Sequence, residues 1–380
     1  MNTTWRQCTI GDVCDTISNT YNSNAQQVVL INTSDVLEGK VLNHIYIPNE
    51  NLKGQFKKTF EEGDILYSEI RPQNKRYAYI DFAPINYIAS TKLMVIRNKN
   101  IVKSKYLYYF LQSDKIISEL QMLAETRSGT FPQITFNELS KLSIKIPPLP
   151  EQDRIISILD SICKKIDINQ QINDNLEEQA KALFKSWFVD NQEPTWEKKT
   201  LADIVNIWDS MRKPLSATER DKMQKIYPYY GATSLMDYVD NYLFDGIYLL
   251  MGEDGTVVDD KGFPILQYVY GKFWVNNHAH VLTGANGFST ECIYILLSTT
   301  NVKSIVTGAV QPKINQANLK NIPIVIPPED VLSDYKAIIH PLFAKIRNNS
   351  MEIHRLTIIH DTLLPKLMSG ELSVEEVSFD

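Results

Sequence analysis

The sequence predicts an α+β protein with a pseudo-twofold repeat: two tandem α+β domains separated by two long helices that pair as an antiparallel coiled coil. Three observations lead to this prediction. The 380 residues are more than one ordinary domain needs. A segment that closes the first half recurs in the second half. Each copy of that segment is followed by a long stretch with the apolar spacing of a helix.

The composition is that of a folded protein without bulk affinity for nucleic acid. Hydrophobic residues make up 43% of the chain and charged residues 22%, which excludes a disordered chain, a collagen and a small disulfide scaffold. The net charge of −6 excludes a polycation, so a nucleic-acid role must come from local patches or from partners. The 4 cysteines form no C-x-x-C pair. We expect a reduced, cytoplasmic protein without a signal peptide or a membrane-spanning segment.

Two matches define the repeat. Residues 134–148 align without a gap with residues 314–328, and both segments end in Ile-x-Ile-Pro-Pro. A Trp-x3-Thr-x2-Asp motif opens each half, at Trp5 and at Trp196. The offset is 180 residues at one end and 191 at the other, so the halves differ by insertions and deletions in their middles. This indicates an order of variable domain, constant helix, variable domain and constant helix, which we place at 1–150, 151–190, 191–328 and 329–370, with a tail at 371–380.

The first domain is predicted to mix strands with a helix. Residues 64–67, 77–80 and 93–96 are short apolar runs of the kind that form strands. Residues 102–123 carry apolar side chains at helical spacing and predict a single helix.

The first long helix is predicted over residues 151–190, which contain neither glycine nor proline. The prolines of segment 147–150 forbid helix before it, and Pro194 stops it afterwards. Apolar side chains alternate at spacings of three and four residues over about five heptads, which is the seam of a coiled coil. About forty residues at a rise of ~1.5 Å make a rod of roughly 60 Å, longer than a core helix needs.

The second domain repeats the mixed pattern. Residues 247–251, 265–270 and 280–283 predict strands, and residues 291–297 predict a helix. Each variable part is therefore expected to form a compact α+β domain.

The second long helix keeps the seam of the first. The polar Asn169 of the first seam corresponds to the polar Asn349 of the second. A buried asparagine in a seam fixes register and partner, so we predict that the helices pair antiparallel with both asparagines near the crossing. Two unrelated surface helices that each tolerate an asparagine are the alternative. Pro341 should kink the helix or delay its start, Pro365 should kink or end its last turns, and Gly370 is the latest stop.

Motifs of catalysis and cofactor binding are absent from the sequence. It has no glycine-rich nucleotide cradle, no Asp/Asn-Pro-Pro-aromatic tetrapeptide and no His-Glu-x-x-His. His278 and His280 would lie on one face of a strand as a metal pair, but two ligands do not make a site, and a structural role is the simpler interpretation. The acids of 253–254 and 259–260 are explained by turn chemistry. We predict neither a metal site nor a nuclease.

A basic segment in the first half is the strongest signal for DNA binding. Residues 53–105 hold 11 basic and 5 acidic side chains, with tyrosines between them. The run 71–76 predicts a stiff loop that presents amide and guanidinium groups, which read adenine and guanine edges in the major groove. A solvated basic face is the alternative for any single residue. The candidate DNA-binding residues of this half are Arg71, Gln73, Asn74, Lys75, Arg76, Tyr77, Lys92, Arg127 and Gln133.

The second half lacks such a patch. Residues 201–300 hold 7 basic and 12 acidic side chains, so another subunit would have to neutralise most of the phosphates there. The candidates for reading base edges in this half are Asn276, Asn277, His278, His280, Gln311 and Lys313.

The boundaries of the repeat resemble the specificity subunit of Type I restriction–modification systems. The resemblance rests on Arg-Ser-Gly-Thr-Phe-Pro-Gln-Ile at 127–134, on Ile-Lys-Ile-Pro-Pro-Leu-Pro-Glu-Gln-Asp-Arg-Ile at 144–155 and on the long helix that follows. The opening motif of each half and Trp-Val-Asn-Asn-His at 274–278 are similar too. The resemblance covers essentially the whole chain, although the second junction reads only Pro-Glu-Asp at 328–330.

The resemblance implies a non-catalytic subunit with two target recognition domains, each reading one half of a split, asymmetric site in double-stranded DNA. Two methyltransferase subunits would carry S-adenosylmethionine and methylate adenine N6, and two restriction subunits would use ATP and Mg²⁺. No cofactor is expected in this chain. Three alternatives stay open: a specificity subunit of a methylation-only complex, a coiled-coil scaffold without DNA readout, and a self-contained nuclease or methyltransferase.

Overall fold

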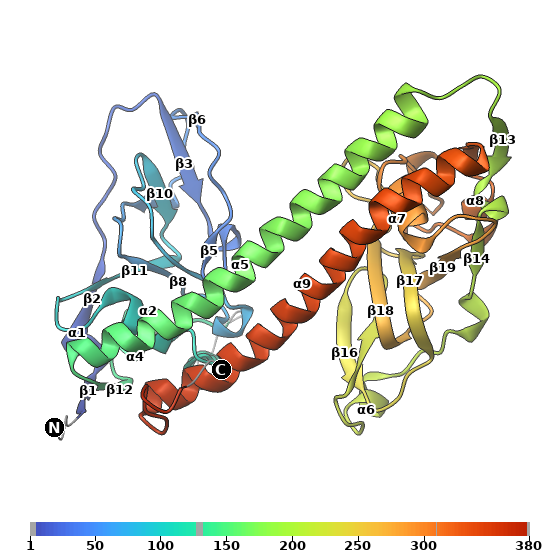
Figure 1. Cartoon of the computed structure of the whole chain (residues 1–380). Helices are drawn as coiled ribbons and strands as arrows, with labels where there is room; N and C mark the ends of the chain where they lie inside the picture. The colour runs from blue at the N-terminus through green and yellow to red at the C-terminus, as the bar shows by residue number, and fades with distance from the viewer. Residues whose placement is uncertain (1–4, 127–131, 309, 378–380) are drawn as a thin grey trace. The chain divides into compact units, whose positions relative to one another are not determined.

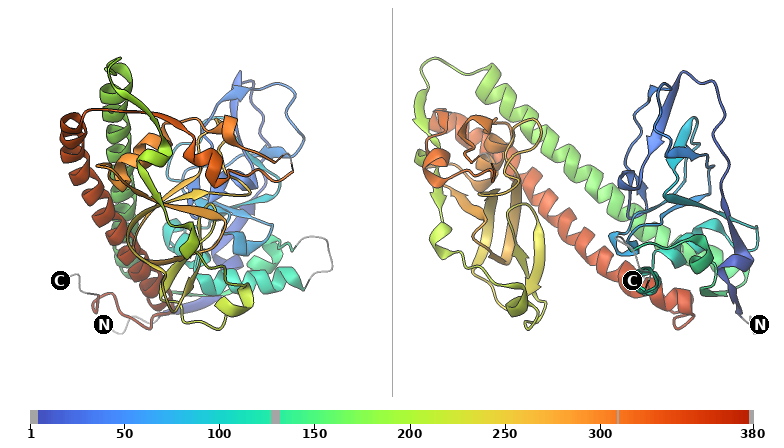
Figure 2. Two further views of the ribbon diagram at one scale, coloured as in Figure 1. Left: turned by 90° about the vertical axis from the view of Figure 1, so that its right-hand side faces the viewer. Right: turned by 180° about the vertical axis from the view of Figure 1, so that it is seen from behind.

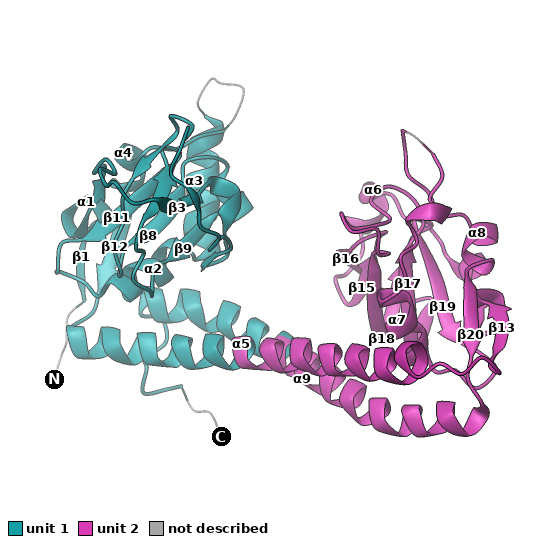
Figure 3. Cartoon of the chain, turned by 90° about the horizontal axis from the view of Figure 1, so that it is seen from above, with its two compact units in different colours: residues 1–166, 354–380 teal, residues 167–353 magenta. Residues whose placement is uncertain are grey.

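The computed structural model describes residues 5–126, 132–308 and 310–377. The chain forms two compact units (Figure 3). Unit 1 comprises residues 1–166 and 354–380, and unit 2 comprises residues 167–353. Each unit therefore contains one α+β domain together with a part of both long helices.

Unit 1 contains two four-stranded sheets that share a core. The first sheet has the order β6-β3-β10-β7, with strands Ile47–Pro48, Gln27–Ile31, Tyr87–Ser90 and Phe56–Lys58. The second has the order β2-β11-β8-β9, with strands Cys14–Ile17, Leu93–Asn98, Ile65–Ser68 and Tyr77–Tyr79. Val29 and Ile31 of the first sheet pack with Leu66 and Val95 of the second. The three strands predicted in this domain are confirmed as β8, β9 and β11, within about two residues at each end.

The predicted single helix at 102–123 is wrong. The structure has two helices there, α2 at Ser104–Leu111 and α3 at Asp114–Glu125. Ser113 breaks the helix because its backbone is extended and its hydroxyl donates to the Phe110 carbonyl. Serine followed by aspartate starts a new helix without any glycine or proline to mark the break.

In both units, the first strand of the domain pairs with the last strand of the same domain. In unit 1, β1 (Arg6–Thr9) pairs antiparallel with β12 (Ser143–Ile146), and in unit 2, β13 (Glu197–Thr200) pairs antiparallel with β20 (Pro323–Ile326). The opening motif is a capping box, since the Asp12 and Asp203 carboxylates accept the N–H groups of the preceding threonines at 2.8 and 2.9 Å. Short helices follow these strands or precede them: α1 (Ile10–Val13), α4 (Phe136–Leu139) and α8 (Gln316–Lys320).

Unit 2 has one six-stranded sheet in the order β14-β19-β17-β18-β15-β16. The strands are Val205–Ile207, Ala279–Gly284, Phe244–Gly252, Leu266–Val275, Tyr227–Tyr230 and Leu235–Val239. All neighbours are antiparallel except β15 and β18. Helix α7 (Thr290–Ser298) packs on the sheet, and the short α6 spans Ala217–Arg220. The predicted strands and helix of this domain are confirmed as β17, β18, β19 and α7.

The two long helices are α5 (Leu149–Lys185), which ends in a π-helical turn at Ser186–Asp190, and α9 (Glu329–Ser369). Helix α5 starts two residues before the predicted Glu151, because proline at the first turn of a helix loses no hydrogen bond. Of the alternatives given for the two prolines, a delayed start at Pro341 and an end at Pro365 are wrong, since α9 runs through both positions, and a kink at either stays a prediction. Helix α9 ends at Gly370, whose φ of +75° terminates helices.

The antiparallel pairing is visible within each unit (Figure 1 and Figure 2). In unit 1, Leu159 near the start of α5 packs in one core with Leu367 near the end of α9. In unit 2, Ala180 near the end of α5 packs with Tyr335 near the start of α9. Among the described residues, every helix falls short of the length or the apolarity that a bilayer crossing needs.

Three asparagines are buried in the helix pair of unit 2. Asn349 Nδ2 donates to Asn173 Oδ1 at 2.9 Å, and Asn169 Nδ2 donates to Glu352 Oε2 at 2.8 Å. The predicted Asn169 and Asn349 thus both lie in the seam, each with a partner on the other helix, and Asn173 joins them. Their role in fixing the register stays a prediction.

Candidate nucleic-acid interface

In unit 1 the predicted loop follows β8 and is held by a second segment. The Arg71 N–H donates to the Pro132 carbonyl at 3.0 Å, and the Ile134 N–H donates to the Glu69 carbonyl at 2.8 Å. These bonds clamp residues 132–134 against residues 69–71. The structure therefore brings the predicted Gln133 next to the predicted loop, although the two are far apart in sequence.

The loop itself is a short 3₁₀ turn at Pro72–Asn74 between two residues with left-handed backbone. Arg71 has φ 45° and Lys75 has φ 52°. Pro72 is buried and anchors the turn, whereas Arg71, Gln73 and Asn74 are exposed. Three of the predicted DNA-binding side chains therefore project into solvent from one turn.

The next three predicted residues are engaged within the protein. Lys75 Nζ lies 3.1 Å from the Asp114 carboxylate, and Arg76 Nη1 donates to the Ser34 carbonyl at 3.0 Å. Tyr77 is only 5% exposed and stacks on Tyr67, contrary to the prediction that it contacts DNA. Alternation along β9 turns Tyr77 into the core, which composition could not show. Arg127 lies outside the described residues.

Lys92 completes the interface of unit 1. Its Nζ donates to Gln133 Oε1 at 3.2 Å and lies 3.6 Å from the Glu69 carboxylate. Its backbone carbonyl accepts the Glu69 N–H at 3.0 Å. Lys92 thus lies beside Gln133, with about half of its side chain in solvent, where a positive charge can meet a phosphate or a guanine edge.

Unit 2 repeats this framework bond for bond. The Gly255 N–H donates to Pro312, the Ile314 N–H to Glu253, and the Glu253 N–H to His278, at 3.0, 2.9 and 2.8 Å. The matching bonds of unit 1 join Arg71 to Pro132, Ile134 to Glu69, and Glu69 to Lys92. The equivalent positions are therefore Glu69 and Glu253, Arg71 and Gly255, Lys92 and His278, and Gln133 and Lys313. Of these four pairs, only the glutamate is the same residue in both units, whereas the bonding partners Pro132 and Ile134 recur as Pro312 and Ile314.

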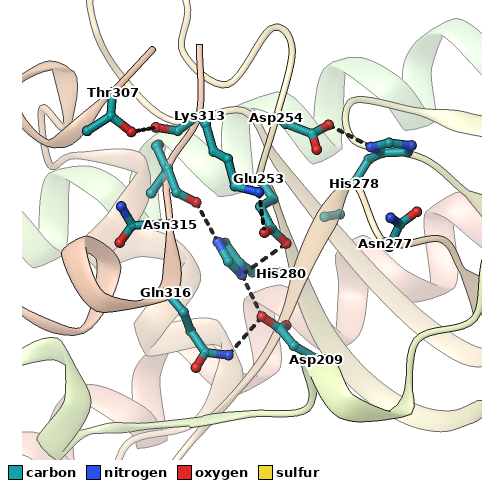
Figure 4. A network of polar contacts seen from close by, with 12 residues as sticks. Asp209, Glu253, Asp254, Asn277, His278, His280, Thr307, Lys313, Asn315 and Gln316 are labelled. Carbon is teal, nitrogen blue, oxygen red and sulfur yellow. Dashed lines mark hydrogen bonds and ion pairs between the residues drawn. The ribbon is translucent and has the colours of Figure 1, made fainter. Parts of the chain in front are cut away.

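A buried polar network supports the framework of unit 2 (Figure 4). His280, only 1% exposed, contacts the Asp209 carboxylate through Nδ1 at 2.7 Å and the Ile314 carbonyl through Nε2 at 2.8 Å. Arg212 donates to Glu253 at 2.6 Å, and Lys313 lies 3.2 Å from the same carboxylate. His280 therefore joins the sheet to the loop of 311–313 and is not available to a base edge, contrary to its prediction.

The acids of this network stay ionised. Burial raises the pKa of Asp209, but the contacts with His280, the Val281 N–H and Gln316 outweigh burial and leave that pKa below its usual value. Burial likewise raises the pKa of Glu253, and its contacts with Arg212, His280 and Lys313 bring the net shift below the usual value. Both carboxylates are therefore fixed negative charges.

The cluster of Asp209, Glu253 and His280 has ligand atoms within 4.8 Å of one another, as a metal site would. The surroundings do not fit a metal. Both ring nitrogens of His280 are engaged, one of them by a backbone carbonyl, and Arg212 contacts both carboxylates. The metal pair weighed for His278 and His280 does not form either, since His278 contacts Asp254 at 2.6 Å instead. We assign the cluster to loop positioning.

The exposed side chains of the unit 2 interface are Asn277, His278, Gln311 and Lys313. Asp254 links the two predicted segments, because it forms an antiparallel bridge with Lys313 and contacts the His278 ring. Asn276 is only 4% exposed and accepts the His278 N–H, so its predicted contact with DNA is contradicted by burial. Sequence reasoning missed the supporting residues Asp209, Arg212 and Gln316, for which no motif exists. It assigned Glu253 to turn chemistry, whereas the Glu253 carboxylate contacts Arg212 and Lys313.

Comparisons with known proteins agree with this repeated architecture. The family model described as Type I restriction modification DNA specificity domain matches residues 2–178 and 193–356. The chain is 31% identical to the Type I restriction enzyme HindI specificity subunit of Haemophilus influenzae, covering 97% of this chain and 99% of that protein. It is 28% identical to the MjaIX specificity subunit of Methanocaldococcus jannaschii over 78% and 77% of the two chains.

A solved structure shows the same fold. The S subunit of a Type I restriction–modification system from M. genitalium superimposes with a TM-score of 0.54 at 18% identity, covering 97% of this chain and 96% of that one. The family model covers both halves, and the HindI subunit aligns over nearly the full length of both chains. The chain therefore belongs to the family of Type I restriction–modification DNA specificity subunits.

Proposed function

We propose that each unit reads one half of a bipartite, asymmetric site in double-stranded DNA. The observation that carries this proposal is the repeated loop framework, which holds different exposed side chains in the two units. Unit 1 presents Arg71, Gln73, Asn74 and Lys92 beside the half-buried Gln133, and unit 2 presents Asn277, His278, Gln311 and Lys313. One scaffold with two different sets of polar and charged groups is what recognition of two unlike half-sequences requires.

The exposed groups suit the major groove. Arginine pairs with guanine O6 and N7 through two bonds, and glutamine or asparagine pairs with adenine N6 and N7. Lys92 and Lys313 are suited to phosphates, which position the protein without specifying sequence. Unit 2 has fewer basic residues, so its half-site depends more on phosphate contacts made by another subunit.

The long helices set the gap between the half-sites in this proposal. Both α5 and α9 are continuous over 37 and 41 residues, and the seam of unit 2 contains paired polar side chains. A rigid antiparallel pair would hold two readers at one separation, and DNA between the half-sites would then be skipped without regard to its sequence.

The partners follow from the family. Two methyltransferase subunits, which bind S-adenosylmethionine and transfer the methyl group to adenine N6, would join the chain on DNA. Two restriction subunits that use ATP and Mg²⁺ would complete the complex. We assign no catalytic step and no cofactor to this chain. A complex that only methylates is the second candidate, because the difference lies in the partners and not in this chain.

The test is a strand-resolved map of N6-methyladenine in DNA from cells that express the chain with its methyltransferase subunit. The proposal predicts one motif made of two short sequences with a fixed gap, and its disappearance when the chain is deleted. An unsplit motif would contradict the two readers. Methylation independent of sequence would favour a scaffold without DNA readout.

A further inference from the structure

We propose that Arg71 is a specificity-determining residue, kept at a strained backbone position so that its guanidinium reads one base of the first half-site. This inference rests on the proposed function and deepens it. It starts from a backbone conformation that is unfavourable for arginine. At the equivalent position of unit 2, the residue with this kind of conformation is a glycine.

The conformation of Arg71 is costly for any residue with a Cβ. Its φ of 45° and ψ of 77° lie in the left-handed region. The adjacent buried Pro72 and the hydrogen bond from the Arg71 N–H to Pro132 hold it there. The conformation is thus imposed by the framework and not chosen by the side chain.

Unit 2 shows what the same position contains without that side chain. The equivalent Gly255 makes the equivalent hydrogen bond to Pro312 and has φ 86°. A Cβ built on Gly255 meets no atom within 4 Å, so space does not demand glycine there. The backbone angle alone explains Gly255, and arginine at the matching position of unit 1 therefore needs a compensating use.

The strain is concentrated around this loop. Of the 7 non-glycine residues with positive φ among the described residues, 4 are asparagines, which tolerate this region. The other 3 are Glu38, Arg71 and Lys75, and the Glu38 N–H donates to the Lys75 carbonyl at 2.9 Å. Strained residues cluster where a protein aims side chains at a ligand. Arg71 is the exposed cation of the three, since Lys75 is half-buried.

The experiment compares Arg71→Gly, Arg71→Ala and Arg71→Lys in the complex with the methyltransferase subunit. Glycine and alanine both remove the guanidinium, but only glycine relieves the backbone. Arg71→Gly should therefore unfold roughly 2–4 °C above Arg71→Ala. Both variants should relax the same single position of the first half-motif by about 5- to 150-fold in relative methylation, with the second half-motif unchanged. Arg71→Lys should relax it too, since lysine cannot form the paired contact.

Gly63→Ala is the matched control in the same complex, because Gly63 has φ 88°, lies in unit 1 outside the interface, and an added Cβ would meet only Ser104 Oγ at 3.9 Å. It adds strain without removing a side chain of the interface, so it should lower the midpoint of unfolding by roughly 2–4 °C and leave both half-motifs intact.

Three outcomes would overturn the inference. These are an unchanged first half-motif in Arg71→Ala, a uniform loss of methylation at all sites that lysine restores, and a midpoint for Arg71→Gly at or below that of Arg71→Ala. A wild-type complex with an unsplit motif would refute the proposed function instead, so the two failures are separable.

Discussion

Asn349 donates a hydrogen bond of 2.9 Å to Asn173 across the helix pair of unit 2, and both side chains are buried. A buried amide pair stabilises a helix pair less than two leucines would, but its hydrogen bond can form in only one register of the helices. The pair therefore links the packing of the helices to the proposed gap between half-sites.

Removal of one partner should destabilise the helix pair. Asn349→Ala leaves the Asn173 carbonyl oxygen without this donor, and we expect a loss of about 1–3 kcal/mol in the free energy of unfolding. Replacement of both by leucine should instead raise the midpoint of unfolding while the gap in the methylation motif becomes heterogeneous. Thermal unfolding and a methylation map measure the two effects. A double variant with a single, unchanged gap would show that these asparagines do not set the register.

The network around Asp209 should affect only the second half-site. Asp209→Asn weakens the contact that holds His280, and His280 holds the Ile314 carbonyl beside the interface. We expect the free energy of unfolding to fall by about 1–3 kcal/mol. Methylation should become less selective for the second half-motif, while the first half-motif is read as before. Equal loss of both half-motifs would contradict independent readers.

The same variant predicts a pH dependence. The pKa of Asp209 is lowered in the folded protein from an ordinary value of 3.8, so the unfolded chain binds the proton first as the solution is acidified. The stabilising contribution of Asp209 is complete above that ordinary value and is lost as the pH falls through it toward the folded pKa. The stability difference between wild type and Asp209→Asn, followed by denaturant unfolding, should be constant near neutral pH and shrink below about pH 4. A difference that grew on acidification would contradict the assignment.

Lys92 is expected to contact a DNA phosphate and to contribute to affinity through its charge. Lys92→Ala should weaken DNA binding by the complex at all sequences alike and reduce the slope of log affinity against log salt by about 1. Lys103→Ala is the matched control, because Lys103 has a similar exposed fraction (45% against 48%) and pairs with Asp153. Titrations at several salt concentrations compare the two. An unchanged slope for Lys92→Ala, or an equal change for Lys103→Ala, would exclude a phosphate contact at Lys92.

The helices and strands were predictable from the sequence where apolar residues recur at a regular spacing. Strands β8, β11, β17 and β19 and the seams of α5 and α9 follow from apolar spacing, and the repeated capping box marks both domain starts. The break between α2 and α3 was missed because Ser113, unlike glycine or proline, does not mark a helix end in the sequence, although its backbone is extended and its hydroxyl bonds the Phe110 carbonyl.

The interface was only partly predictable, because side-chain direction depends on register. Tyr77, Asn276 and His280 have the right chemistry for DNA but point inward. The equivalence of Glu69 with Glu253 and of Lys92 with His278 was hidden, since these pairs are separated by 184 and 186 residues while Gln133 and Lys313 are separated by 180. Loops of different length between the equivalent strands shift the sequence alignment of the two units. The equivalent residues are identified only by the hydrogen bonds that they share.

The most direct test of two readers on a helical spacer is the methylation motif of a lengthened chain. One heptad inserted at 166–167 in α5 and one at 353–354 in α9 add two turns to each helix and keep the seam facing its partner. Seven residues add ~10.5 Å, or about three base pairs at ~3.4 Å each. The account predicts both half-sequences unchanged and a gap longer by about three base pairs. An unchanged gap, or an altered half-sequence, would contradict it.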